Sequence, residues 1–278
     1  MKLGSNLILT IVAIFLAQSL SSPAISSSDS ATLSHLPAPK VKRIDIAKPT
    51  HILFVGNSYF YYNDSLHNHV QRMVVAAGLF KPSDLSYKSA TIGGAALFDH
   101  NIDHLLDPYN LRVTKPFDIV LLQGGSAAAL SDIRRKRFTE TAADYAQKIR
   151  QAGGEPILYM THAYVDPHRR YRPGMIAEIA SLYIEAGNKI DALVIPVGLA
   201  FEEAYRRQPK ISLHKSFDGS HPDILGTYLA AATVFASIYG QSPVGNSYDY
   251  FGEVKREDAV FLQTVAQDVV TKFYRRDR

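Results

Sequence analysis

From residue 51 onward, short apolar runs alternate with longer stretches in which apolar residues recur every three or four positions. Five apolar runs have the length and the β-branched or aromatic content of buried strands. They cover Ile52–Val55, Leu85–Thr91, Phe117–Leu122, Pro156–Met160 and Ala192–Val197. The run over 117–122 is nearly continuous, which is typical of a strand that is covered on both faces.

The stretches between these runs have the periodicity of amphipathic helices, with capping residues before them and glycines after them. Helices are expected between Ser65 and Gly78 and over 137–152, 175–186, 222–239 and 257–274. Alternating strands and helices favour a parallel sheet with helices on both faces. We therefore expect one α/β domain over residues 51–278: a flavodoxin-like, three-layer α/β/α fold with a central parallel five-stranded sheet.

The first fifty residues have a different pattern. Lys2 precedes the apolar run Leu7–Ala17, and small residues follow up to Ala24. This order of a basic residue, an apolar run and small residues is typical of a secretory signal peptide, and the apolar run is shorter than a membrane-spanning helix requires. We expect a signal peptide over 1–24 and a flexible Ser-, Ala- and Pro-rich lead-in over 25–50. The protein would then be exported, periplasmic or extracellular, with no stable membrane anchor after cleavage; an uncleaved N-terminal anchor is the alternative.

The composition excludes several kinds of site. The 278 residues include no cysteine, so disulfides, thiolate zinc sites, iron–sulfur clusters and a cysteine nucleophile are ruled out. The net charge is +4, and the excess lies in arginine clusters within 134–137, 169–172, 206–207 and 275–278. Nucleic-acid binding favours a denser basic stripe, so no nucleic-acid partner is expected. The clusters are interpreted as solvated helix ends and loops, with attraction to an acidic polymer as the alternative.

Polar residues and glycines follow the first three predicted strands. Ser58 comes just after the first strand, Gly93 and Gly94 follow the second, and Gln123 follows the third. Functional groups of a parallel α/β sheet collect at the carboxyl ends of its strands. A serine there can expose its hydroxyl above the sheet, and glycine-turn N–H groups or a carboxamide can donate to a developing oxyanion.

A second pattern lies before the penultimate predicted helix, where Asp218 and His221 are three residues apart on a glycine-containing turn. The imidazole of such a pair can accept a serine proton while the carboxylate orients it. Taken singly, each of these motifs is also ordinary turn or capping chemistry. Their expected position at one edge of the sheet favours a site composed of Ser58, His221 and Asp218.

This ordered set of motifs resembles the SGNH (GDSL-like) hydrolase superfamily over about residues 51–240. Ile52–Ser58 is similar to the first block of that family, with Asn in place of the commoner Asp at position 57. Gly93–Gly94 is similar to the second block, and Asp218–Pro222 matches the fifth. The third block usually carries Gly-x-Asn-Asp, whereas this chain has Gln123 and no Asn at the corresponding strand end.

The resemblance implies roles for these residues. Ser58 would be the nucleophile, His221 the general base and Asp218 the orienting acid. The oxyanion donors would be the N–H groups of Ser58 and Gly94, with Gly93 as the alternative, and the Gln123 amide would replace the missing Asn.

The resemblance also implies an activity. The expected reaction is hydrolysis of small acyl esters, acetyl esters foremost, of a small molecule or a carbohydrate, and it needs no cofactor. An acyltransferase with the same triad and a catalytically silent binding module of the same fold are the alternatives.

The remaining candidates lie close to these strand ends. Asn57, Tyr59 and His162 are candidates for lining the pocket; the alternatives are that Tyr59 anchors its loop to the core and that His162 is an ordinary loop histidine. His100 and His104 have helical spacing, but no Glu adjoins the first His and no third ligand is evident. We therefore expect no metal site.

Overall fold

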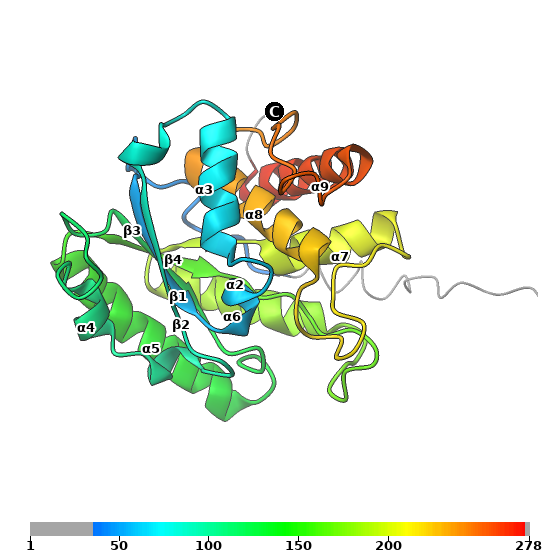
Figure 1. Cartoon of the computed structure of the whole chain (residues 1–278). Coiled ribbons are helices and arrows are strands. Elements are labelled where there is room, and N and C mark those ends of the chain that lie inside the picture. The colour runs from blue at the N-terminus through cyan, green and yellow to red at the C-terminus, as the bar shows by residue number, and fades with distance from the viewer. Residues whose placement is uncertain (1–35, 276–278) are drawn as a thin grey trace, which may run out of the picture.

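The computed structural model describes residues 36–275, so the predictions for 1–24, for 25–35 and for the last three residues lie outside it. Five parallel strands form one sheet in the order β2-β1-β3-β4-β5. Figure 1 shows this sheet between two groups of helices. The strands are β1 (His51–Gly56), β2 (Ser86–Thr91), β3 (Ile119–Gln123), β4 (Glu155–Tyr159) and β5 (Leu193–Ile195). The predicted flavodoxin-like, three-layer architecture is confirmed.

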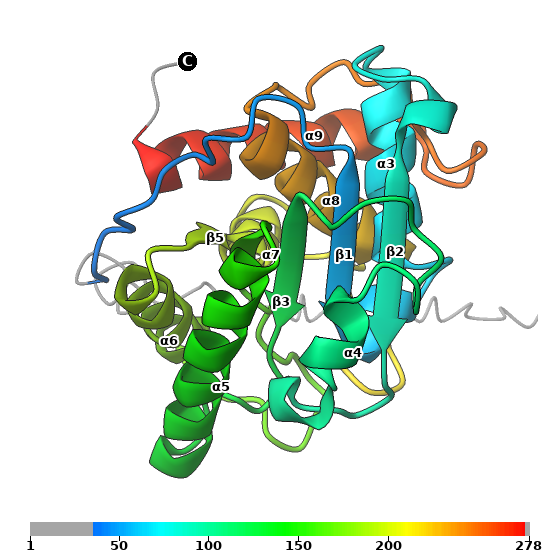
Figure 2. The ribbon, with the colours of Figure 1, turned by 90° about the vertical axis from the view of Figure 1, so that its left-hand side faces the viewer.

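Helices cover both faces of the sheet (Figure 2). On one face lie α3 (Leu66–Ala76), α7 (Val197–Arg207), α8 (Ile224–Tyr239) and α9 (Arg256–Tyr274). On the other lie α4 (Ile102–Leu106), α5 (Asp132–Gln151) and α6 (Met175–Lys189). A four-residue helix, α2 (Ser58–Tyr61), and two 3-10 turns, η1 (Pro82–Asp84) and η2 (Leu97–Asp99), complete the described elements. Among these helices of residues 36–275, none has the length and apolar character needed to cross a membrane.

Alternate residues of each strand enter two separate cores. Ile52 and Phe54 of β1 pack in the core below α3 and α8, whereas Leu53 and Val55 pack in the core below α5 and α6. All four side chains are completely buried. This explains why the strands are read as continuous apolar runs rather than as alternating ones.

Two elements near β5 differ from the sequence-based expectation. The strand ends at Ile195, and the unpredicted helix α7 begins directly after Pro196. Helix α6 continues beyond its expected end at residue 186, through Gly187 and as far as Lys189. A Cβ atom on Gly187 would lie 2.3 Å from the Val194 side chain. The glycine therefore permits close packing of α6 on β5 instead of ending the helix.

Residues 36–50 have no regular secondary structure, yet they are packed against the domain. Pro39 and Pro49 are buried, and the Lys40 N–H donates to Oδ1 of Asn188 in α6 at 2.8 Å. Three further side chains pack against the core beneath α9 and α8: Val41, Ile44 and Ile46. The expectation of a flexible lead-in is wrong for this part, because Pro39 and Pro49 are buried and Val41, Ile44 and Ile46 are partly buried against the helices.

Candidate active site

Ser58 is the first residue of α2, which starts directly after β1. Asn57 precedes it in an extended conformation, and its side-chain oxygen accepts a hydrogen bond from the Tyr59 N–H at 3.1 Å. An asparagine in this position caps the start of the helix. The N–H of Ser58 is one of the groups that the helix itself cannot satisfy, so it can donate to an anion at this edge of the sheet.

Asp218 and His221 contact each other in the loop before α8. Oδ1 of Asp218 accepts hydrogen bonds from the N–H groups of Ser220 (2.8 Å) and His221 (3.0 Å), and Oδ2 contacts Nδ1 of the His221 ring. Burial alone would raise the pKa of Asp218, but the bonds from the His221 ring and from these N–H groups hold it below its ordinary value. An ionised carboxylate here orients the ring and keeps its hydrogen on Nδ1.

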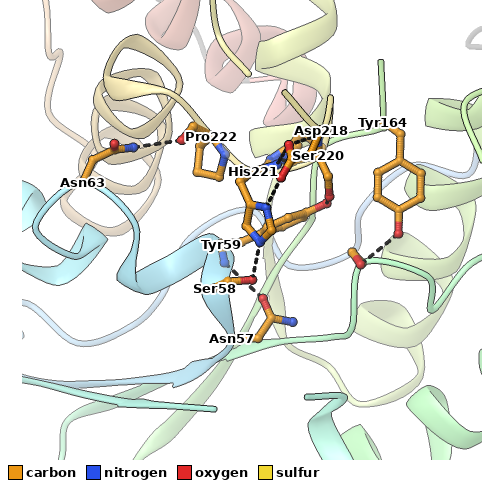
Figure 3. Close-up of polar contacts among 11 residues, drawn as sticks. Asn57, Ser58, Tyr59, Asn63, Tyr164, Asp218, Ser220, His221 and Pro222 are labelled. Carbon is orange, nitrogen blue, oxygen red and sulfur yellow. Dashed lines mark hydrogen bonds and ion pairs between the residues drawn. The ribbon is translucent and has the colours of Figure 1, made fainter. Parts of the chain in front are cut away.

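The hydroxyl of Ser58 lies 2.8 Å from Nε2 of His221, although 163 residues separate the two (Figure 3). With the hydrogen on Nδ1, Nε2 is the acceptor and the hydroxyl is the donor. The side chains of Ser58, His221 and Asp218 thus form a continuous hydrogen-bonded chain. Such a chain can remove the hydroxyl proton while the oxygen attacks a carbonyl carbon. The His221 side chain is 26% exposed, so solvent reaches the site.

Aromatic rings hold the plane of the His221 imidazole. Tyr62, at the end of α2, stacks on it with a centroid separation of 4.3 Å and an interplanar angle of 13°. Tyr59 approaches the same ring edge-on, at 6.0 Å and 87°. A stacked ring restricts rotation of the imidazole and presents an aromatic face to positive charge on it.

The turn at Gly93 and Gly94 lies beside the turn that follows β1. The two are joined by a hydrogen bond of 2.9 Å from Nδ2 of Asn57 to the carbonyl of Ala95. Gly94 has a φ of +73°, and nothing lies within 4 Å of the place where its Cβ would be. At Gly93 the hydroxyl of Tyr61 would lie 3.3 Å from a Cβ. Gly94 is therefore the more open of the two expected backbone donors.

Gln123 is buried at the end of β3, and its amide is hydrogen-bonded on both sides. Nε2 donates to Oδ1 of Asn57 at 2.8 Å and to the carbonyl of Gly124 at 2.9 Å, and Oε1 accepts from the Asn57 N–H at 3.1 Å. A Cβ on Gly56 would lie 2.4 Å from Oε1, so the absent side chain makes room for the amide. Because both amide hydrogens are used within the protein, this geometry does not support the expected donation from Gln123 to an oxyanion. The amide orients Asn57 instead.

Asn57, Tyr59 and His162 lie beneath the site, with exposed fractions of only 3%, 3% and 1%. Asn57 is turned inward by Gln123. The ring of His162 is stacked between those of Tyr59 (4.2 Å) and Phe201 (4.4 Å). Because α2 and the segment after β4 direct these three side chains into the interior, the geometry favours a packing role for them over lining a pocket.

Two residues at the site were not recognised as part of it from the sequence. Ser220 lies inside the 218–222 motif, and its hydroxyl is 2.9 Å from that of Tyr59. Asn63, in the turn between α2 and α3, donates from Nδ2 to the carbonyl of Pro222 at 2.9 Å. Ser220 could have been identified from the sequence, because it lies inside the 218–222 motif. No local pattern links residue 63 to residue 222.

The histidines that were considered as metal ligands do not converge. His100 is buried, whereas His104 and Asp103 are exposed, and Asp103 is ion-paired with Lys148 at 2.8 Å. Within residues 36–275, no group of three or more His, Cys, Asp or Glu side chains is arranged to hold a metal ion.

No protein-family model matches the chain, and no curated protein matches its sequence. Solved structures do match it. A DUF4886 family protein from Bacteroides uniformis ATCC 8492 is 17% identical, with a TM-score of 0.61 over 80% of this chain and 95% of that one. A Slackia heliotrinireducens protein proposed to be an SGNH hydrolase is 19% identical, with a TM-score of 0.53 over 68% and 99%. An acetyl xylan esterase is 16% identical, with a TM-score of 0.52 over 67% and 98%. The chain therefore has the fold of the SGNH hydrolases, as its motifs implied.

Proposed function

We propose that this chain is a serine esterase that hydrolyses small acyl esters, acetyl esters foremost, through an acyl-enzyme formed on Ser58. The observation that carries the proposal is the chain of contacts from the Ser58 hydroxyl through His221 to Asp218. The N–H groups of Ser58 and Gly94 are the proposed oxyanion donors. The likeness to an acetyl xylan esterase supports an acetylated carbohydrate as the substrate.

The proposed reaction has two halves. His221 takes the proton of Ser58 as the oxygen attacks the ester carbonyl, and Asp218 stabilises the resulting imidazolium. The oxyanion collapses, and His221 protonates the departing alcohol, which leaves an acyl group on Ser58. Water then gives a proton to His221 and attacks the acyl-enzyme, and Ser58 departs with that proton as the carboxylic acid is released. These steps require no metal or organic cofactor.

Two exposed aromatic residues adjoin the proposed catalytic residues in the chain. Tyr61 and Phe217 lie near Ser58 and Asp218 in the chain and are 43% and 70% exposed. Their rings offer flat surfaces to a sugar ring or an acyl chain. Acyl transfer to an alcohol would require exclusion of water. The exposure of His221 therefore favours water over another acceptor.

The test measures hydrolysis of p-nitrophenyl acetate and of acetylated xylan oligosaccharides by the purified protein. A fluorophosphonate probe should label wild type at Ser58. Ser58→Ala should abolish labelling and lower kcat on the order of 10³-fold or more. Ser83→Ala, at an exposed position in η1, is the matched control and should behave as wild type. Equal rates for wild type and Ser58→Ala would remove the assigned nucleophile, and failure to label wild type would favour the silent binding module.

We also propose that the protein is exported, on the basis of the signal-peptide pattern over 1–24. Mass spectrometry of protein recovered from the periplasm or the medium should find an N-terminus close to residue 25. An intact Met1 on the exported protein would contradict cleavage.

A further inference from the structure

The segment that carries Ser58 and the loop that carries His221 are joined by more than the contact between these two residues. Tyr59 follows Ser58, and Ser220 precedes His221. The hydroxyls of Tyr59 and Ser220 lie 2.9 Å apart, so a second hydrogen bond stands beside the reacting pair (Figure 3). Neither hydroxyl has a role in the proposed chemistry.

A third link lies on the other side of the reacting pair. Nδ2 of Asn63 donates to the carbonyl of Pro222 at 2.9 Å and to the hydroxyl of Thr227 at 2.8 Å. Asn63 is itself held, because its carbonyl accepts a hydrogen bond of 2.6 Å from Nε2 of His69. Its φ of +53° is one that asparagine tolerates better than most residues. The loop around His221 is thus bonded to the Ser58 segment both before and after the imidazole.

His162 fixes the same loop from below. Its Nε2 donates to the carbonyl of Ser220 at 2.8 Å, and its ring is sandwiched between two aromatic rings. Nδ1 of His162 is buried without a hydrogen-bond partner in the part of the chain that the structure describes. Burial and the neighbouring His214 keep the pKa of His162 well below its ordinary value, so the ring is neutral. Buried polar atoms without partners are uncommon and call for an explanation, such as a functional role for the side chain that carries them.

We propose that Tyr59, Asn63 and His162 are positioning residues that set the distance and angle between the Ser58 hydroxyl and the His221 ring. They act through the 218–222 loop, which they hold at Ser220 and Pro222. The inference rests on the proposed esterase function, because the geometry it describes is that of the reacting pair.

The short length of α2 makes external positioning necessary. A helix of four residues has almost no stability of its own, so contacts with its surroundings determine its orientation. The 218–222 loop also lies outside the sheet. Its backbone is held by the bond from the Gly219 N–H to the Lys215 carbonyl (3.0 Å), by that from the Lys215 N–H to the His221 carbonyl (2.8 Å) and by that from the Val165 N–H to the Gly219 carbonyl (2.8 Å). These bonds fix the shape of the loop, and the contacts with Tyr59 and Asn63 link it to the Ser58 segment. A displacement of about 1 Å between reacting groups can cost about 100-fold in rate.

The first test removes single hydroxyl groups. Tyr59→Phe and Ser220→Ala each delete one partner of the same bond and leave the rest of the side chain in place. Each should lower kcat on p-nitrophenyl acetate by about 10-fold to 100-fold, with KM within about 2-fold of wild type. The double variant should be no slower than the slower single variant, since both lose one interaction. Wild-type kcat in both single variants, or effects that multiply in the double variant, would overturn the proposal.

The second test asks whether donors at the other two positions can be restored. Asn63→Gly tolerates the positive φ but lacks the donor, so its kcat should fall with little change in KM. His162→Leu should lose activity, whereas His162→Gln, whose amide can donate to the Ser220 carbonyl, should recover part of it. Equal activity of the Leu and Gln variants would count against a positioning role for His162.

Controls separate positioning from general loss of structure. Tyr145→Phe deletes a buried tyrosine hydroxyl that bonds to the His100 carbonyl and takes no part in the contacts between the Ser58 segment and the 218–222 loop, so this variant should keep wild-type kcat. Thermal unfolding should show that Tyr59→Phe and Tyr145→Phe lose similar stability.

Crystal structures provide a readout that does not need activity: in Tyr59→Phe the distance from Ser58 Oγ to His221 Nε2 should exceed about 3.5 Å. An unchanged distance would refute the proposal even if no substrate were turned over. An active wild type with an unaffected Tyr59→Phe overturns only the positioning role, whereas an active Ser58→Ala overturns the proposed function.

Discussion

At the scale of single residues, Gln123 contacts Asn57, the residue before Ser58, rather than pointing its amide into the site. Its place at the end of β3 can be predicted from the apolar run before it. The direction of its amide cannot, because the side chain has enough rotatable bonds to reach either the sheet edge or the backbone of Asn57. The space left by Gly56 and the donors and acceptors of Asn57 decide in favour of the second.

The Gln123→Glu variant tests this interpretation with a side chain of the same size. The carboxylate would place an acceptor against Oδ1 of Asn57 and the carbonyl of Gly124, which both accept from Nε2 in wild type. The free energy of unfolding in urea should fall by about 1–3 kcal/mol, together with kcat. Unchanged stability combined with a large loss of kcat would instead indicate that Gln123 acts directly on the oxyanion.

Tyr62 provides a second prediction for a single residue. Its stacked ring should stabilise the imidazolium that forms at His221 during the reaction. Tyr62→Leu should therefore lower kcat by about 2-fold to 5-fold, which corresponds to about 0.5–1 kcal/mol, whereas Tyr62→Phe should stay close to wild type. The kcat values of both variants are measured by steady-state kinetics on p-nitrophenyl acetate. Equal rates for the Leu and Phe variants would exclude a role for the ring face.

At the scale of elements, the long and periodic helices were predicted, although α5 begins at Asp132 rather than at the expected residue 137, and α2 and α7 were missed. Helices α8 and α9 match their predicted ranges to within about two residues, because their apolar faces extend over four turns or more. Helix α2 was missed, since four residues are too few for any periodicity to show. Helix α7 was missed because it follows β5 without a loop, so the strand and the helix read as one apolar run.

Asn57→Asp tests the local structure at the start of α2. The carboxylate keeps the acceptor for the Tyr59 N–H, but it loses the donor to the Ala95 carbonyl and places an oxygen against it. Although Asp is commoner at this position in the family that the chain resembles, the free energy of unfolding should fall by about 1–3 kcal/mol. Asn68→Asp, at an exposed bond in α3, is the control and should lose less. Equal losses in urea unfolding would show that the Asn57 amide has no special role.

At the scale of the whole molecule, the loops around the site meet at one edge of the sheet, and His162 and His214 are buried beneath them. His214 is 5% exposed, and it lies between the hydroxyl of Tyr205 and the carbonyl of Ala163. Burial lowers its pKa to about 4. Folding thus depends on keeping His214 and His162 neutral in the layer that supports the 218–222 loop.

This burial predicts a loss of stability in mild acid. Between pH about 6.5 and about 4, the unfolded chain binds a proton at His214 that the folded chain does not, so the free energy of unfolding falls as the pH falls. His214 alone contributes up to about 3 kcal/mol to this loss. Urea unfolding at pH 7 and pH 4.5 should show this decrease in the free energy of unfolding. The decrease should be smaller in His214→Phe, and in the exposed control His104→Gln it should be as large as in wild type. Stability that is constant over this range would contradict the prediction.

The amino-acid sequence by itself determined the alternation of strands and helices, the single parallel sheet and the positions of Ser58, Asp218 and His221 along the chain. These follow from local rules, because hydrophobic periodicity and turn residues report which face of each element is buried. Only the tertiary structure decided that Tyr59 and Asn63 reach the 218–222 loop and that Gln123 turns toward Asn57. The physical reason is that such contacts join segments from 66 to 161 residues apart. They depend on how the loops close over the sheet edge, and no local pattern of residues encodes that closure.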